Sequence, residues 1–314
     1  MKKELGIAGL LLVLCIVVEC LNHRFLSATN LHNMAQLIGM YGIFGIGAGL
    51  VIITGGIDLS VGSMFALLGV LLAIMLTEKQ WPWPAAVAIV LAIGAGLGSL
   101  HGFLITRVKL QPFVVTLCGL LFYRGLARFI ANDDTKGFGE ATGFEGLKDF
   151  MTGSVAGIPV SFILLLVVAA VMAVVLHRSI YGRYLYAVGR NEDAARYSGI
   201  NTRRVIATAY VLSGLLAGLA GILIAFYTNS ISPASHGSFY ELYGIAAAVL
   251  GGCSLRGGEG SILGILLGTA LLQVLNNLVN LLGIPSSLDF AVMGAVILLG
   301  VVADQLVKGR KAMA

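Results

Sequence analysis

The stretch RSIYGRYLYAVGRNEDAARYSGINTRR, residues 178–204, separates two long apolar runs and decides how the chain is organised. The protein is 58% hydrophobic and only 11% charged, yet six arginines fall inside this one stretch. They are Arg178, Arg183, Arg190, Arg196, Arg203 and Arg204. Such a segment cannot lie in the hydrocarbon of a membrane, and it is too long for a simple turn. It predicts a structured element outside the membrane that docks onto a partner.

The apolar runs on both sides are long enough to cross a bilayer as helices. They lack the period-two alternation of a membrane barrel, so the sequence predicts an all-α polytopic membrane protein. We expect about ten transmembrane helices in one membrane domain over residues 1–314. The predicted spans are 5–22, 32–54, 59–77, 84–106, 112–132, 158–177, 204–228, 239–252, 261–282 and 286–306. The eighth is too short to cross comfortably, which predicts a tilted or broken element.

Positive charge is distributed unevenly between the two sides of this arrangement. Fourteen of the 20 lysines and arginines fall on the side of residues 178–204, and four fall in the opposite loops. The remaining two, Arg124 and Arg128, lie inside the fifth span. The positive-inside rule therefore places residues 178–204 and both termini in the cytoplasm. The net charge of +5 is thus a signal of topology and not of nucleic-acid binding.

The outer loop at 133–157 is long, rich in glycine and acidic. Its acids Asp133, Asp134, Glu140, Glu145 and Asp149 outnumber Lys136 and Lys148. Two interpretations stay open: a solvated loop, or a docking surface for a partner outside the cytoplasm.

The chain carries no motif of an enzyme site. It has no GxxxxGK[ST] phosphate loop, HExxH metal motif or GxSxG nucleophile elbow. We therefore expect no catalytic residue, metal or cofactor, and no hydrolysis of ATP by this chain. The polar residues inside the spans become the candidate functional groups, because polar groups in the membrane are costly.

The ninth span carries a polar stripe. Its members recur every three or four residues, so they share one face of a helix. They are Thr269, Gln273, Asn276, Asn277 and Asn280. The stripe either joins helices by hydrogen bonds or lines a hydrophilic path. Because amides both donate and accept, such a path suits a neutral, hydroxyl-rich solute better than an ion.

Two charged residues stand out in other spans. Arg124 lies about 18 Å into the fifth span, so it must face protein or water. Asp289 is a possible partner, in a structural ion pair or in a gating or solute contact. Asp58 opens the third span in GGIDLSVGS, either as a helix cap or in a kinked re-entry beside a transport path. GGIDL at 55–59 is echoed by GGCSL at 251–255, which hints at an internal repeat.

GGIDLSVG (55–62), YGRYLYAVGRNEDAARYSGIN (181–201) and GGCSLRGGEGSILG (251–264) together carry a family resemblance. The chain resembles, over nearly its whole length, the permease subunits of ribose-type ABC sugar importers. The resemblance implies a bacterial inner-membrane protein with four kinds of partner: the lipid bilayer, a second permease copy or paralogue, a cytoplasmic ATP-binding subunit and a periplasmic sugar-binding protein.

The resemblance also assigns roles to residues. The segment that couples to the ATPase corresponds to Gly189, Arg190, Asn191, Glu192, Asp193, Ala195, Arg196, Gly199 and Ile200. The signature loop corresponds to Gly55, Gly56, Asp58, Ser60 and Gly62. Local chemistry agrees, because Asn191 is a good N-cap, Glu192 and Asp193 suit a first turn, and Gly199 suits a helix end. The sequence therefore predicts one short coupling helix.

Two functions follow from different classes. The first is the permease of a binding-protein-dependent ABC importer, which moves a monosaccharide by alternating access along a path that includes the polar stripe and Arg124. The second is a self-sufficient secondary transporter or channel for a small polar solute, which would need coupling acids that the spans barely offer. Dependence on ATP separates the two.

Overall fold

The structure, a computed structural model, describes residues 2–139 and 142–285 and the single positions 288, 291, 292, 294, 295 and 298. Within these residues, eight helices are long and apolar enough to cross a membrane. They are α1 (Lys2–Leu21), α2 (Ala28–Ile53), α3 (Val61–Ala73) with its π-helical continuation η1 (Ile74–Glu78), α4 (Trp83–Thr106), α5 (Pro112–Ala131), α7 (Val160–His177), α10 (Thr202–Thr228) and α12 (Ile262–Leu281). The all-α polytopic prediction is confirmed. The predicted tenth span, 286–306, lies outside the described residues apart from isolated positions.

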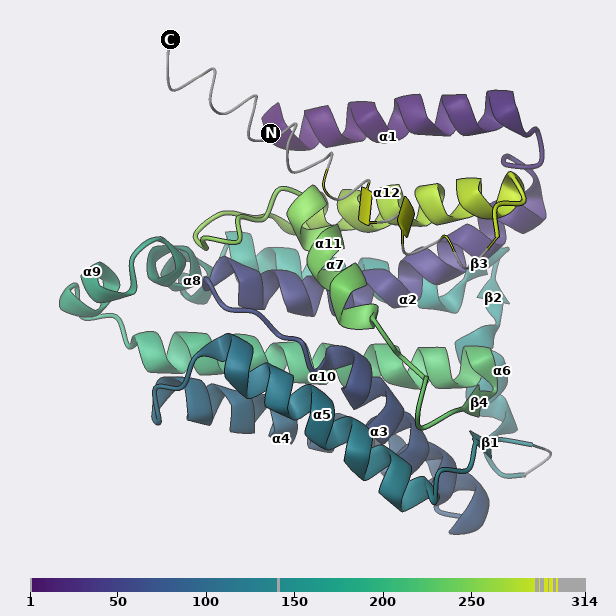
Figure 1. The fold of residues 1–314 in the computed structure, drawn as a ribbon, viewed down its shortest axis with the longest axis horizontal. Coiled ribbons are helices and arrows are strands. Elements are labelled where there is room, and N and C mark those ends of the chain that lie inside the picture. The colour runs from purple at the N-terminus through teal and green to yellow at the C-terminus, as the bar shows by residue number, and fades with distance from the viewer. Residues whose placement is uncertain are drawn as a thin grey trace.

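The bundle has a buried centre and a lipid-exposed rim. Most of α2, α3 and α10 is buried, whereas α1 lies at the edge beside α12 (Figure 1). Its side chains Leu5, Leu10 and Leu12 are exposed, as expected of a helix that faces lipid. The helix pair α4 and α10 packs closely, because small residues spaced by four on α4 let the two backbones meet at Gly94 and Gly214.

α11 (Tyr240–Leu250) is the short eighth element. Its 11 residues span about 16 Å, roughly half of a 30 Å hydrocarbon layer. The expectation of a short eighth element is confirmed. The chain reaches α11 from the end of α10 through β4 (Ser230–Ile231) and residues 232–239.

α3 is the second element that begins inside the bundle. After α2 ends at Ile53, residues 55–60 are not helical and run back along the bundle before α3 starts (Figure 1). The Tyr210 hydroxyl donates to the Ile57 carbonyl at 3.1 Å, and Tyr210 lies about 12 Å along α10 from its first residue. The first turn of α3 is therefore enclosed by other helices.

The acidic stretch 133–157 is folded rather than a plain loop. It contains β1 (Lys136–Gly137), which pairs antiparallel with β4, then α6 (Glu145–Thr152), and β2 (Ser154–Val155) paired with β3 (Ile158–Pro159). Phe138 and Phe144 are buried and stack near Phe226 of α10. Asp133 forms an ion pair with Arg128, and Glu140 lies outside the described residues. The solvated-loop interpretation therefore does not describe the buried part of this stretch, and docking of a partner here stays a prediction.

Candidate functional site

Residues 178–204 form two helices that project beyond one end of the bundle (Figure 1). These are α8 (Ile180–Arg190) and α9 (Glu192–Tyr197). α8 starts at Ser179, whose hydroxyl accepts from the Gly182 N–H at 3.2 Å. The sequence analysis predicted only one short helix here and missed α8. The signal was present, because Leu185 and Val188 recur at helical spacing and are buried in the structure.

The predicted start and end of α9 are confirmed. The Asn191 side-chain oxygen accepts from the Ala194 N–H at 2.9 Å, which is the expected N-cap bond. Gly199 has a φ of +83° just after the helix. The Ile200 N–H then donates to the Ala195 carbonyl at 3.1 Å, as in a Schellman ending. The fold of this segment is therefore set by local chemistry.

α9 has an inner and an outer face. On the inner face Ala195 is buried, and the Glu192 carboxylate accepts from the Thr202 hydroxyl at 3.0 Å. On the outer face Asp193 pairs with Arg196, and the Tyr197 side chain is 86% exposed. An aromatic ring so exposed at the tip of a projecting helix is typical of an interface anchor. The sequence analysis did not include Tyr197, although it lies inside the predicted coupling segment.

Gly189 connects α8 to the bundle. A Cβ at this position would overlap the carbonyl oxygen of Ile53, the last residue of α2. That same carbonyl accepts from the Gly258 N–H at 2.8 Å, so the loop after α11 meets α2 at the same point. Gly257 of this loop packs against Gly55. Gly55 and the loop that follows α11 are thus neighbours, and the α8–α9 pair contacts this loop where α2 ends.

The signature loop surrounds a buried acid. Asp58 is buried, and its Oδ1 accepts from the Ser60 N–H at 3.0 Å and from the Ser60 hydroxyl at 2.7 Å. Its Oδ2 accepts from the Ser213 hydroxyl of α10 at 3.1 Å. The structure places Ser60, not Asp58, at the N-cap of α3. Asp58 therefore fixes the re-entrant segment to α10, which fits the kinked re-entry better than a simple cap.

Arg124 of α5 holds the segment before α11. One guanidinium nitrogen, Nη1, donates to the Pro233 carbonyl at 3.1 Å and to the His236 carbonyl at 2.7 Å. Asp289, the proposed partner, lies outside the described residues. Among the described residues, Glu241, which is buried in the first turn of α11, is an acid close enough to act electrostatically on Arg124. The sequence analysis overlooked Glu241, although an acid inside a predicted span was a visible signal.

Glu241 also marks where α3 and α11 meet. Gly62 lies in the first turn of α3, and a Cβ there would overlap Glu241 Oε2 and the Gly237 carbonyl. The first turns of α3 and α11 are therefore in direct contact. The signature loop, Arg124 and the start of α11 form one central polar cluster.

The polar stripe of α12 has members in different surroundings. Thr269 and Gln273 are buried, Asn276 is half-buried and Asn280 is exposed. Asn277 exchanges two side-chain hydrogen bonds with Asn30 of α2, at 2.6 and 3.0 Å. For Asn277 the structure thus provides the helix-joining bond, and a role of the stripe in a path stays a prediction.

Comparison with known proteins agrees with this architecture. The family described as "Branched-chain amino acid transport system / permease component" matches residues 30–301. The ribose import permease protein RbsC of Escherichia coli K12 is 40% identical over 294 residues, which cover 94% of this chain and 91% of that protein. The protein of the same name in Bacillus subtilis strain 168 is 41% identical, with 94% and 90% covered.

A third relative is the D-allose transport system permease protein AlsC of Escherichia coli K12, which is 32% identical over 95% of this chain and 91% of that protein. No solved structure matches the chain. With eight apolar helices in the part of the chain that the structure describes, this is a multi-pass membrane protein. The match along nearly the whole length shows that this chain belongs to the family of permease components of transport systems.

Proposed function

We propose that this chain is the permease of an ATP-driven, binding-protein-dependent importer for a monosaccharide of the ribose type. Full-length relatives are named for ribose and D-allose, and the fructose import permease protein FruF of Bifidobacterium longum is 30% identical. The family's printed description refers to amino acids, but similarity to individual sugar permeases over the whole chain is the closer guide to the solute.

The observation that carries the proposal is the projecting pair α8 and α9. A secondary transporter or channel has no need of a helix pair with an exposed aromatic tip outside the membrane. In the importer, this pair receives the movement of a separate ATP-binding subunit. Gly189 lies against the end of α2 and beside Gly257 and Gly258, which in turn pack near Gly55. A displacement of α9 is therefore passed through these contacts to the re-entrant segment and the central polar cluster.

In this arrangement the whole chain is one membrane domain of the bacterial inner membrane, and a second copy or a paralogue completes the path. The α8–α9 end and both termini face the cytoplasm. The start of α1 lies at that end, because Glu4 accepts from the Ser261 hydroxyl and Gly260 accepts from the Tyr186 hydroxyl of α8. A periplasmic sugar-binding protein delivers the solute at the opposite end, where the acidic stretch 133–157 is one candidate contact.

The solute then passes the central cluster and the α12 stripe. Amide and hydroxyl groups there can exchange hydrogen bonds with a sugar without a net charge. Rigid-body alternation of the two permease copies changes which side has access.

The test is uptake of radiolabelled ribose into proteoliposomes that hold the permease with its ATP-binding subunit and are supplied with the binding protein. We expect uptake to require ATP on the side of the vesicle membrane that carries the ATP-binding subunit. An ionophore, which dissipates ion gradients, should leave this uptake unchanged. Uptake by the chain alone, driven by an ion gradient and abolished by the ionophore, would establish the secondary transporter instead.

A further inference from the structure

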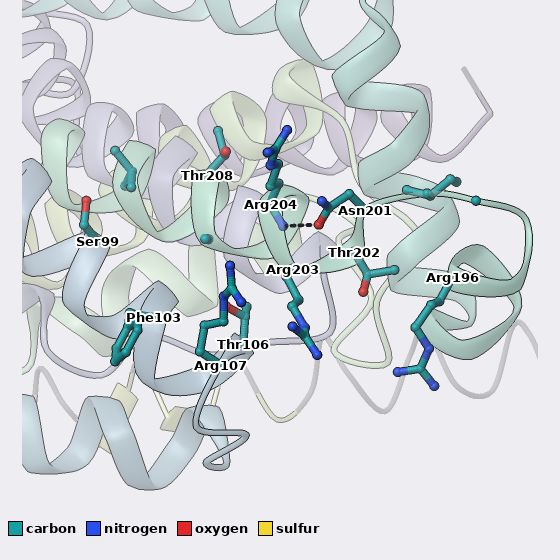
Figure 2. A pocket seen from close by; sticks show the side chains of 14 residues that line it. Ser99, Phe103, Thr106, Arg107, Arg196, Asn201, Thr202, Arg203, Arg204 and Thr208 are labelled. Carbon is teal, nitrogen blue, oxygen red and sulfur yellow. Dashed lines mark hydrogen bonds between the residues drawn. The ribbon is translucent and has the colours of Figure 1, made fainter.

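An open groove lies at the base of the α8–α9 pair. It has a volume of about 790 Å³ and is bounded by the last turns of α4, the first turns of α10 and the turn that follows α9. Figure 2 shows Ser99 and Phe103 toward one end and the four arginines spread over the rest, with the side chains of Arg203 and Arg204 directed to opposite sides. The groove takes no part in the transport path described above.

The charged end of the groove is strongly basic. Arg107, Arg196, Arg203 and Arg204 line it, and none of the described residues that line it is acidic. Arg196 pairs with Asp193 on α9. In the part of the chain that the structure describes, no acidic side chain forms an ion pair with Arg107, Arg203 or Arg204. Three guanidinium groups of the lining are thus not paired with a described acid, and guanidinium suits phosphate.

The groove changes from charged to apolar along its length. On α10 the lining runs from Arg203 to Val211, a rise of about 12 Å. On the antiparallel α4 it runs from Arg107 to Ser99 over the same length, past Phe103. The Phe103 side chain is 55% exposed, on the rim that α4 presents to lipid. The ligand that fits has an anionic head at the cytoplasmic end and an apolar tail along the helices.

We propose that this groove binds one anionic phospholipid of the cytoplasmic leaflet. Its phosphate lies among Arg107, Arg203 and Arg204, and an acyl chain lies along Phe103, Ala207 and Val211. A soluble anion would leave the apolar end unused, and a protein segment would have to enter the bilayer to reach it. The proposal rests on the cytoplasmic placement of α9, and it is independent of which solute is carried.

The occupied groove has a consequence for α9. Gly199 and Ile200, which end this helix, also line the groove. A bound headgroup therefore joins the end of α4 to the base of the projecting pair. We infer that the lipid holds α9 in place for its partner.

The test measures lipid binding to the purified full-length chain by native mass spectrometry, with dioleoyl phosphatidylglycerol as the probe and dioleoyl phosphatidylcholine as the neutral comparison. The groove variant is Arg107→Gln/Arg203→Gln/Arg204→Gln. We expect phosphatidylglycerol to bind it about 100-fold more weakly than wild type, because each basic residue near an anionic lipid contributes about fivefold.

A matched variant removes the same charge elsewhere at the same end. Arg178, Arg183 and Arg256 are exposed and do not line the groove, so Arg178→Gln/Arg183→Gln/Arg256→Gln should bind the probe within about twofold of wild type. Equal loss in both triple variants, or equal binding of phosphatidylcholine, would overturn the proposal. So would displacement of the lipid when the ATP-binding subunit joins the complex, because the groove would then belong to that interface.

Two further measurements distinguish a lipid site from a soluble-anion site and test the apolar end of the groove. Glycerol phosphate has the anionic head without the tail, and competition as strong as that of the whole lipid would mean a soluble-anion site. If the triple variant unfolds, Phe103→Ser tests the apolar end, since this exposed side chain contributes little to folding. It should weaken phosphatidylglycerol binding and leave glycerol phosphate unaffected, and unchanged lipid binding would refute the tail assignment.

Discussion

Replacing Tyr197 by alanine tests whether α9 is the contact with an ATP-binding subunit. The side chain is 86% exposed, so nearly all of its surface is free to be buried by a partner. A tyrosine offers roughly 200 Å², and burying about half of the exposed part at 25 cal/mol per Å² contributes about 2 kcal/mol. We therefore expect Tyr197→Ala to weaken binding of the subunit about 30-fold. The free energy of unfolding should change by less than about 0.5 kcal/mol, because the ring packs against little of its own chain.

The assay is titration of the detergent-solubilised permease with its ATP-binding subunit, followed by biolayer interferometry. Tyr227→Ala is the matched control, because Tyr227 is 45% exposed at the opposite end of the bundle. It should leave the dissociation constant of the subunit unchanged. A Tyr197→Ala protein that binds as tightly as wild type would refute the assignment of the outer face of α9 as the contact. Loss of binding in both variants would point to a general defect of the preparation.

Three other substitutions separate the remaining roles. Gly189→Ala should lower ATP-coupled uptake severely while membrane insertion persists, because the added Cβ overlaps the end of α2; Gly96→Ala, where the space is open, should transport normally. Asn277→Leu should lower the free energy of unfolding by about 1 kcal/mol through the two lost bonds to Asn30, and a changed KM for the sugar would instead place it on the path. Asp58→Ala should lower the free energy of unfolding by about 1–3 kcal/mol, measured by thermal unfolding, whereas Asp58→Asn, which retains one acceptor, should lose less.

Predictions that depend on local chemistry agreed with the structure. Asn191 and Gly199 mark the bounds of α9 through bonds within a few residues, and apolar length located the eight long helices that the structure describes. The face of α9 that packs inward could not be predicted, because a helix of six residues carries too little periodicity. The family resemblance grouped Ala195 with the coupling residues, and the structure places it on the buried face of α9.

The central polar cluster needed tertiary information for a different reason. Residues 55–60 left two interpretations open, a helix cap by Asp58 or a kinked re-entry, and nothing in their sequence decides between them. Arg124 was correctly expected to face the interior, but its partners are the carbonyls of Pro233 and His236, and any residue type could have supplied them. Contacts to backbone carbonyls cannot be inferred from residue types, because every residue has a carbonyl.

The contact between the first turns of α3 and α11 limits how the bundle can move. The amino end of a helix carries about half a positive charge, and Glu241 lies where two such ends and Arg124 converge. If α11 slid away from α3, the carboxylate would be separated from part of this compensating charge in a medium that solvates it poorly. Electrostatics therefore holds the first turns of α3 and α11 together, and we expect these two helices to move as one unit during transport.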